Sequence, residues 1–276
     1  MSDVSKTVQG HYTQGTLLER IFEHLEESGI GKGRLTQEDL YPFDQLHGRG
    51  VAATKDHVEF AEITPDMHVL DLGCGIGGSS RFLVSHCDCR VTGIDLTQEF
   101  VDVARVLTAL CGLTNRIDFR QANALNMPFE DASLDHVWSH NVTMNIEDKT
   151  GLATEIARVL KPQGRLSCAE IGQGPAGEPS YPLPWASNSS SSFLATPDDM
   201  RSALETGGLR VIKQIDLTET NLAAQKEMRE RAERGELPLQ VNHVVLGDDF
   251  PQRAQNAGKM MLEGRLVEHM IMAEKP

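Results

Sequence analysis

The sequence predicts an α/β fold, in which helices flank a seven-stranded and mostly parallel sheet and an N-terminal helical lid precedes it. From Met67 onward, short apolar runs alternate with amphipathic stretches of ten or more residues, which is typical of parallel strands joined by helical crossovers. The chain has 276 residues, enough for one large domain or two small ones. Its 39% hydrophobic and 24% charged residues are the balance of a globular protein with a buried core.

The apolar runs predict seven strands, near residues 67–72, 90–95, 116–121, 134–139, 164–171, 209–217 and 265–273. The amphipathic stretches predict helices near residues 78–86, 98–111, 149–160, 197–206 and 249–262. Residues 122–132 include Pro128 and predict a loop. Pro162 and Gly164 end the helix before the fifth strand, because Pro cannot continue a helix and Gly suits the turn.

Two segments fall outside this alternation. Residues 1–62 are predicted to form an N-terminal helical cap, with helices near 16–28 and 50–61 around a Gly-rich break at 29–33. Residues 63–276 form the main domain. Within it, the Gly-, Pro- and Ser-rich residues 172–195 follow the carboxyl end of a strand, where a lid over the active site is as well supported as a flexible linker.

Charge and composition exclude several functions. The net charge of −14 repels phosphate backbones and anionic lipid, so we expect neither a nucleic-acid nor a membrane partner. No apolar run approaches the ~18 residues of a membrane span. Five scattered cysteines and an N-terminus without a signal pattern predict a cytoplasmic protein. Cys87 and Cys89 lack a second ligand pair, so no metal is expected, and a homo-oligomer stays open.

The strongest local signal is a strand that runs into the glycine cluster at residues 69–78, VLDLGCGIGG. Glycine allows a sharp turn and lets a ligand approach the backbone. Gly73, Gly75 and Gly78 also satisfy the dinucleotide pattern G-x-G-x-x-G, and Asp95 lies 20 residues after Gly75, where it can accept ribose hydroxyls in either case. Asp71 favours a ligand with a sulfonium over a pyrophosphate, because it attracts the former and repels the latter.

Asp71, Gly73, Gly75 and Gly77 match the acidic-x-Gly-x-Gly-x-Gly motif, and further matches lie at residues 92–95, 127–135 and 158–164. With these four motifs in order, the chain resembles the class I S-adenosylmethionine-dependent methyltransferases, which implies a Rossmann-like sheet and S-adenosylmethionine as cofactor. The resemblance implies a cofactor site made of Asp71, Gly73, Cys74, Gly75, Gly77, Asp95, Leu96, Asn123, Ala124, Leu125 and His140.

Within this set, the turn at residues 73–77 would contact the methionine part, Asp95 and Leu96 the ribose, and residues 123–125 the adenine. Asn123 departs from the family's usual aspartate. Its amide oxygen can still accept a hydrogen bond from adenine, and a plain turn residue is the alternative.

Residues 40–55, 138–145 and 193–200 narrow the resemblance to the sarcosine and dimethylglycine N-methyltransferases. The methyl acceptor would then be a small polar metabolite, such as the amine of a glycine derivative. Aromatic rings would then surround a methylated ammonium group of the acceptor. Arg49 is the first candidate to pair with a carboxylate of the acceptor. The expected acceptor pocket comprises Tyr12, Tyr41, Gln45, His47, Arg49, Asn141, Asn145, Tyr181 and Trp185.

His140, Asn145 and Tyr12 occupy the expected catalytic positions. Asn145 cannot act as a base, and His140 and His47 have no sequence neighbour that marks an oriented pair. We therefore expect an acceptor whose nucleophile needs no enzyme base, such as a tertiary amine or a thioether. The alternatives are a small-molecule S- or O-methyltransferase, an NAD-dependent oxidoreductase that uses the second glycine pattern, and a non-catalytic S-adenosylmethionine-binding protein.

Overall fold

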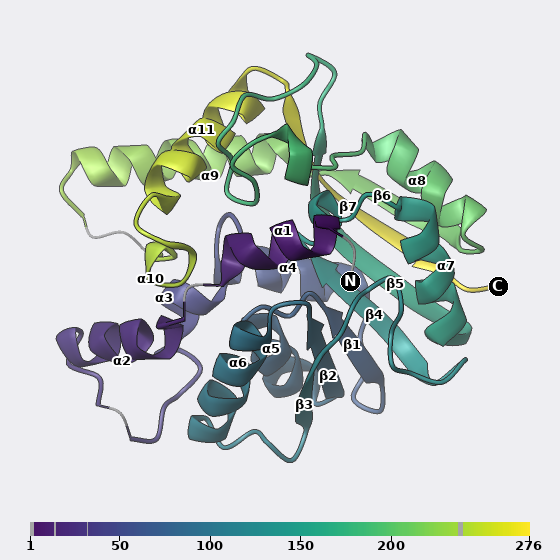
Figure 1. Ribbon diagram of the computed structural model, residues 1–276, viewed down its shortest axis with the longest axis horizontal. Coiled ribbons are helices and arrows are strands. Elements are labelled where there is room, and N and C mark those ends of the chain that lie inside the picture. Colours follow the sequence, from purple (N-terminus) through teal and green to yellow (C-terminus); the bar gives the residue numbers. More distant parts are fainter. Residues whose placement is uncertain (1–2, 14, 32, 237–239) are drawn as a thin grey trace.

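The computed structural model describes residues 3–13, 15–31, 33–236 and 240–276. A seven-stranded sheet forms its centre, and helices cover both faces (Figure 1). The strand order is β3-β2-β1-β4-β5-β7-β6, and only β7 runs antiparallel to its neighbours. This confirms the predicted sheet. The strands are β1 (His68–Leu72), β2 (Arg90–Asp95), β3 (Ile117–Gln121), β4 (Leu134–His140), β5 (Leu160–Gln173), β6 (Arg210–Asp216) and β7 (Leu266–Glu274).

The helices that the sequence predicts between the strands are present in the structure. They are α5 (Gly78–Cys87), α6 (Gln98–Leu110), α7 (Lys149–Val159), α8 (Pro197–Thr206) and α11 (Phe250–Leu262). In the N-terminal segment, α2 (Leu17–Glu27) and α4 (Val51–Ala61) match the two expected helices. No helix of the described residues is long and apolar enough to cross a membrane.

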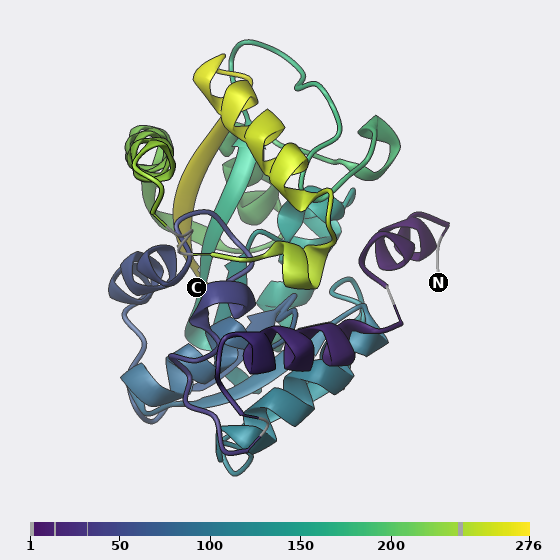
Figure 2. The same cartoon turned by 90° about the vertical axis from the view of Figure 1, so that its left-hand side faces the viewer.

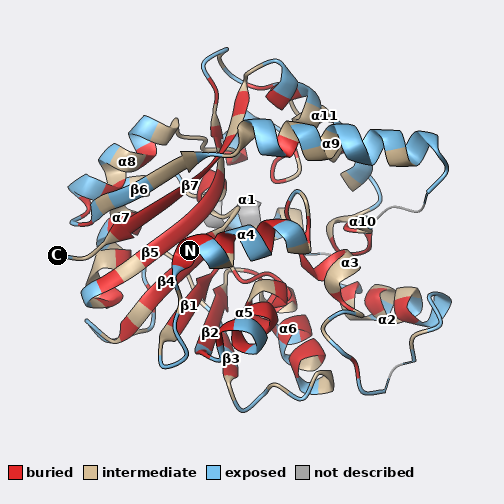
Figure 3. Cartoon of the chain, turned by 180° about the vertical axis from the view of Figure 1, so that it is seen from behind, coloured by how far each residue is buried: buried red, intermediate tan, exposed pale blue. Residues whose placement is uncertain are grey.

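Four further helices are absent from the sequence-based prediction, namely α1 (Asp3–Tyr12), α3 (Tyr41–Asp44), α9 (Thr218–Glu233) and α10 (His243–Leu246). Two short 3₁₀ turns, η1 (Thr143–Asn145) and η2 (Ser189–Ser191), complete the elements. The longest omission, α9, is largely exposed (Figure 3), and Asn221 is its one buried residue. A helix with so little buried surface shows no apolar stripe, and that stripe is the signal by which helices are predicted.

The start of β5 differs from the prediction. The strand begins at Leu160, which pairs with Leu134, and the ladder resumes with His136 opposite Arg165 after a register shift. Gln163 takes the left-handed conformation with φ 65°. Residues 161–164 therefore form an irregularity within the strand rather than a turn before it.

The end of the predicted N-terminal cap is part of the core. Helix α4 packs on β5, α5 and β7. Its His57 ring stacks on the indole of Trp138 in β4, with the ring centroids 3.5 Å apart. Phe60 packs with Met270 and Met272 of β7. The four helices of residues 3–61 thus differ in role, because α4 covers the sheet while α1 to α3 lie beyond it (Figure 2).

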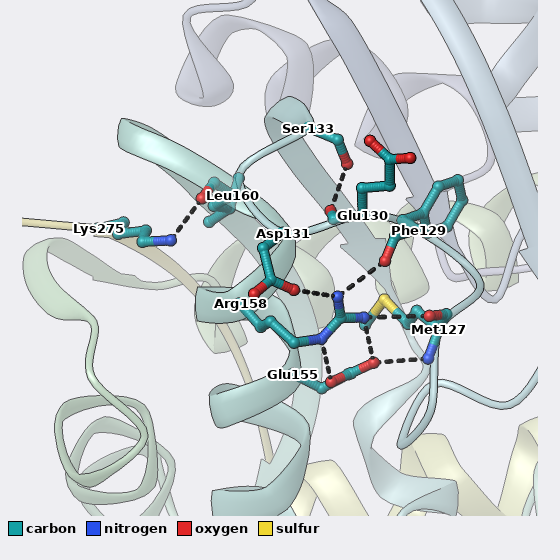
Figure 4. A network of polar contacts seen from close by, with 9 residues as sticks. All are labelled: Met127, Phe129, Glu130, Asp131, Ser133, Glu155, Arg158, Leu160 and Lys275. Carbon is teal, nitrogen blue, oxygen red and sulfur yellow. Dashed lines mark hydrogen bonds and ion pairs between the residues drawn. The ribbon is translucent and has the colours of Figure 1, made fainter.

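The partly exposed guanidinium of Arg158 holds the loop between β3 and β4 (Figure 4). Arg158 of α7 donates to the carbonyl oxygens of Met127 and Phe129, at 3.1 and 2.7 Å, and to the carboxylates of Asp131 and Glu155. Glu155 also accepts from the Met127 amide at 2.7 Å. Two of the sequence motifs, at residues 127–135 and 158–164, therefore bind each other and fix the loop that follows β3.

His269 of β7 makes stability depend on pH. Burial lowers the pKa of this imidazole to about 4, so between pH 4 and 6.5 the unfolded chain binds a proton that the folded chain does not. Stability from this group is complete above pH 6.5 and is lost as the pH falls. We expect His269→Leu to flatten the slope of unfolding free energy against pH in that window by roughly 1.4 kcal/mol per pH unit.

Urea unfolding at pH 4.5, 5.5, 6.5 and 7.5 measures this slope for the parent and the variant. The control is His243→Leu, which alters an exposed histidine at the start of α10. Parallel slopes for the parent and His269→Leu would contradict the prediction.

Candidate active site

The carboxyl ends of β1, β2 and β4 open into a cavity of about 1020 Å³. The chain turns to opposite sides of β1 here, because β2 pairs on one side and β4 on the other, and ligands bind at such switch points in open α/β sheets. Of the predicted site residues, the cavity brings together Tyr12, His47, Arg49, Gly73, Gly75, Asp95, Leu96, Asn123, Ala124, Leu125, His140, Asn141, Asn145 and Trp185.

Asp95 presents a carboxylate at the end of β2. Its Oδ1 accepts from the Thr97 amide at 2.8 Å, and its Oδ2 accepts from the Gly75 amide at 3.0 Å. Burial raises the pKa of Asp95, and hydrogen bonds from Thr97, Gly75 and Leu96 lower it. The carboxylate also lines the cavity, where it can accept hydrogen bonds from hydroxyl groups of a ligand.

Three residues of the expected cofactor set lie outside the cavity lining. Asp71 is buried and accepts a hydrogen bond from Ser80 Oγ at 2.5 Å, and burial raises the pKa of Asp71 to about 7. The Cys74 side chain packs in the core beside β2, and Gly77 adjoins Phe119 and Arg81. The expectation that Asp71 attracts a sulfonium is therefore not supported by its position, because its carboxyl group serves the start of α5 instead.

The glycines of the turn serve close packing as well as ligand access. A Cβ on Gly73 would lie 2.5 Å from Val142 Cγ2, and one on Gly78 would lie 2.1 Å from the carbonyl oxygen of Asp44. Both distances are far below a normal contact. The turn after β1 thus needs glycine so that the loop after β4 and the N-terminal segment can reach it.

Three residues of the expected acceptor pocket also lie outside the cavity lining. Gln45 is buried and accepts from Thr54 Oγ1 at 2.5 Å while donating to Asp44 at 2.8 Å. Tyr41 packs against Phe82 of α5, and Tyr181 packs in the cluster around Trp185. The predicted aromatic pocket is therefore reduced to Tyr12 and Trp185, because the other tyrosines pack on neighbouring elements.

Asn123 lies in the turn after β3, at the edge of the cavity. Its Oδ1 accepts from the Leu125 amide at 2.9 Å, which makes it a turn residue. It also lines the cavity. The carbonyl oxygen keeps one acceptor position for a ligand.

Tyr12 and Asn145 meet across the cavity. Their side chains are hydrogen-bonded, while burial raises the pKa of the Tyr12 hydroxyl to about 12. Within the described part of the chain, Asn145 Oδ1 is buried and has no hydrogen-bond partner. This oxygen is therefore available to a ligand, whereas the Tyr12 hydroxyl keeps its proton at neutral pH.

His47 and His140 stack on each other with ring centroids 3.7 Å apart and planes 1° apart. Burial lowers the pKa of His47 to about 4 and holds the pKa of His140 well below its usual value, and the neighbouring rings of His47 and His57 also disfavour a charge on His140. Both rings are therefore neutral at pH 7. Nδ1 of His140 is buried with no hydrogen-bond partner among the described residues.

Glu170 of β5 positions the loop after β4, and sequence reasoning did not identify it. Its carboxylate accepts from Ser139 Oγ at 2.7 Å and from the amides of Val142 and Thr143 at 2.9 and 3.0 Å. Asn141 in the same loop takes the left-handed conformation with φ 56°. A buried acidic residue in a strand was the available signal, because such a group needs hydrogen-bond donors.

Helices α9 and α11 form the remaining wall of the cavity. The sequence predicts α11 as a helix but not its place at the cavity, and it does not predict α9. Their inward residues include Ala224, Met228, Ala257 and Met261. Residues 172–195 close the cavity from another side: Trp185 lines it, and the Pro184 carbonyl accepts from Arg253 of α11 at 2.7 Å. The lid interpretation of this segment agrees with these contacts.

Residues 70–168 match the family model described as a methyltransferase domain. This segment, which is about a third of the chain, is therefore similar to methyltransferase domains. The chain spans about half the length of the first curated relatives it matches. One of them, the methyltransferase GfsG of Streptomyces halstedii, is 32% identical over 133 residues, which is 48% of each chain. Other relatives carry names of O-, C- and N-methyltransferases.

Solved structures share the fold of this chain. Geranyl diphosphate C-methyltransferase from Streptomyces coelicolor has a TM-score of 0.71 at 18% identity, with 100% of this chain and 99% of that chain covered. A candidate sarcosine dimethylglycine methyltransferase from Galdieria sulphuraria has a TM-score of 0.59 at 19% identity, with 82% and 81% covered. The match of residues 70–168 agrees with the expected class of enzyme, and the relatives' names do not single out sarcosine.

Proposed function

We propose that the chain transfers the methyl group of S-adenosylmethionine to a small-molecule acceptor. The observation that carries this proposal is one continuous cavity that is lined both by the Asp95 carboxylate at the end of β2 and by a separate wall from α9 and α11. A cavity of about 1020 Å³ is at the upper end of the size of small-molecule sites. It has room for a cofactor and an acceptor together.

The residues present fit S-adenosylmethionine. Asp95 would hold the ribose hydroxyls, the backbone at Gly73 and Gly75 would lie beside the methionine part, and residues 123–125 would flank the adenine. When bound, the cofactor supplies an electrophilic methyl carbon on a sulfonium. The protein then has to align an acceptor lone pair with that carbon and exclude water, and orientation of this kind contributes roughly 7 to 11 kcal/mol.

The lid is built for such exclusion of water. Arg253 ties the Pro184 carbonyl to α11, and His11 of α1 lies 3.3 Å from the same oxygen. Tyr12, the next residue, meets Asn145 of the loop after β4. Helix α1, the lid and α11 therefore enclose the cavity together over the loop that Glu170 positions.

On the sequence resemblance alone, a nitrogen acceptor such as a glycine derivative comes first, and sulfur or oxygen acceptors are the alternatives. The lining of the cavity favours a less polar molecule. The names of the relatives include N-, O- and C-methyltransferases. The element that receives the methyl group is therefore left to experiment.

The test combines binding with turnover. Calorimetry compares S-adenosylhomocysteine with NAD, and we expect binding of the former alone. The enzyme is then incubated with S-adenosylmethionine labelled in the methyl group and a metabolite extract, and a labelled product is expected. Tighter binding of NAD would favour the oxidoreductase alternative. Binding of S-adenosylhomocysteine without transfer to any extract fraction would favour a non-catalytic binding protein.

The histidine pair gives a prediction for the pH dependence of turnover. Because both imidazoles are neutral above about pH 5 in view of their depressed pKa values, we expect kcat with a saturating acceptor to show no ionisation between pH 6 and 8. We also expect His140→Ala to lower kcat by less than tenfold, since the proposed nucleophile needs no base. A fall of two orders of magnitude, with unchanged cofactor affinity and loss of an ionisation near pH 6 to 7, would instead make His140 a general base.

A further inference from the structure

The part of the cavity beyond Asp95 is lined mainly by hydrocarbon side chains. Met228 of α9, Met261 of α11, Leu266 of β7 and Ile171 of β5 face the same space as Trp185 of the lid. Alanines and a glycine of α9 and α11 lie between them. Burial of apolar ligand surface against such a wall favours binding by roughly 25 cal/mol per Å².

The polar groups of this region are mostly satisfied by one another. The amide of Asn221 donates to the Glu268 carboxylate and accepts from Gln225 at 3.1 Å. Gln240 donates to the carbonyl oxygens of Gln45 and His47, each at 3.1 Å. A highly polar acceptor such as a glycine derivative would find few free partners here.

Arg49 is an exception, as are Asn145 Oδ1, His140 Nδ1 and Asn242 Oδ1, which also lack partners among the described residues. The Arg49 side chain is 9% exposed and lines the cavity. Nη1 donates to Asp56 at 2.7 Å, whereas Nε and Nη2 are buried without a partner among the described residues. Buried donors gain from a ligand that accepts hydrogen bonds.

The acidic side chains around Arg49 favour a neutral acceptor group on the ligand over a charged one. Asp56 already pairs with the guanidinium, and Glu268 lies close enough for Arg49 to lower its pKa while burial raises it. A second carboxylate from the acceptor would therefore meet two acidic groups beside one cation. A neutral oxygen, such as a carbonyl, accepts from Nε and Nη2 without that repulsion.

We propose that the acceptor is a predominantly apolar molecule with a neutral hydrogen-bond-accepting oxygen that binds Arg49, rather than a small glycine derivative. This inference rests on the proposed function for the identity of the ligand as methyl acceptor. The hydrocarbon part would lie between α9 and α11, and the oxygen would lie at the base of the cavity beside α4.

Binding of probes to the protein saturated with S-adenosylhomocysteine tests the inference. The first probe, 2-acetonaphthone, carries an aromatic hydrocarbon and one carbonyl, and 2-ethylnaphthalene lacks the oxygen. We expect the ketone to bind at least tenfold more tightly than the hydrocarbon, and we expect no calorimetric signal from sarcosine or dimethylglycine at millimolar concentration. Binding of either amino acid without binding of the ketone would overturn the inference.

Variants locate the two contacts. In Arg49→Met we expect the ketone and the hydrocarbon to bind with affinities within twofold of each other, because the donors are gone. Met228→Asp introduces a charge into the apolar wall at an exposed helix position that lines the cavity and should weaken both probes at least tenfold. The matched control is Ala223→Asp, on the exposed face of α9 outside the cavity, which should leave both affinities unchanged.

Failure of the inference can be told apart from failure of the proposed function. Transfer of the labelled methyl group only to water-soluble amines, with no effect of Met228→Asp, would keep the methyltransferase and overturn the apolar acceptor. Probe binding that follows the expected variant pattern, in a protein that binds no S-adenosylhomocysteine, would keep the apolar site and overturn the methyltransferase. Probe affinities that Arg49→Met and Met228→Asp leave within twofold of the parent would overturn the inference in either case.

Discussion

Replacing Asp95 by Ala is expected to weaken the binding of S-adenosylmethionine by at least about 100-fold. Two hydrogen bonds from ribose hydroxyls to an ionised carboxylate contribute roughly 1.5 to 3 kcal/mol each, and tenfold in affinity corresponds to about 1.4 kcal/mol. The variant also leaves the amides of Gly75 and Thr97 without the hydrogen bonds that they donate to Asp95 in the parent. Titration calorimetry with S-adenosylhomocysteine and S-adenosylmethionine measures the loss.

Two further variants separate loss of contact from loss of structure. Asp95→Asn keeps the shape of the side chain but removes its charge, so an intermediate loss of affinity is expected. Asp102→Ala removes an exposed aspartate of α6 whose partners are Gln98 and Arg105, and its affinity should equal that of the parent. Affinity within twofold of the parent in Asp95→Ala would show that the ribose lies elsewhere.

The ion pair between Arg81 and Asp44 is expected to produce the largest effect on stability. Both side chains are 1% exposed, with 2.9 Å between Nη2 and Oδ2. Arg81 also donates to the Ile76 carbonyl at 3.0 Å and to Thr108 at 3.1 Å. Removing one partner of a buried pair leaves an uncompensated charge, so Asp44→Ala should lower the free energy of unfolding by roughly 3 to 5 kcal/mol.

Urea denaturation monitored by circular dichroism measures this change at pH 7. The control is Asp118→Ala, because the pair of Asp118 with Arg120 is exposed and such pairs contribute about 0 to 1 kcal/mol. If Asp44→Ala does not fold, the double variant Asp44→Leu/Arg81→Met replaces both charges with apolar groups and should regain most of the stability. A loss below 1 kcal/mol in Asp44→Ala would contradict the prediction.

The sheet is the part of the structure that the sequence predicts best. Strands such as β1 and β2 are short apolar runs whose inner positions are buried on both faces, and such runs are visible without knowledge of their neighbours. Helix α9 has no comparable signal, because its polar sequence forms one wall of a cavity and faces solvent elsewhere. Elements that enclose an empty space show weaker patterns than elements that enclose a core.

The candidate site likewise contains residues that the sequence predicts and residues that it does not predict. Asp95 was predictable because a strand end after a glycine turn places its carboxylate at the switch point. Asp71 and Cys74 lie in the same motif, yet their side chains pack behind the turn. Tyr41 likewise packs on Phe82. A motif fixes where the backbone turns, whereas the direction of each side chain depends on contacts that the tertiary structure provides.

The two outermost strands bear on how copies of this chain can associate. β3 and β6 each pair on one side only, so each has a row of backbone donors and acceptors that a strand from a second molecule can extend. β6 carries the exposed charges of Arg210, Lys213 and Asp216, and β3 carries those of Asp118 and Arg120. Burying such charges in a continuous intermolecular sheet is costly. We therefore expect that any homo-oligomer forms through helical surfaces and leaves both sheet edges in water.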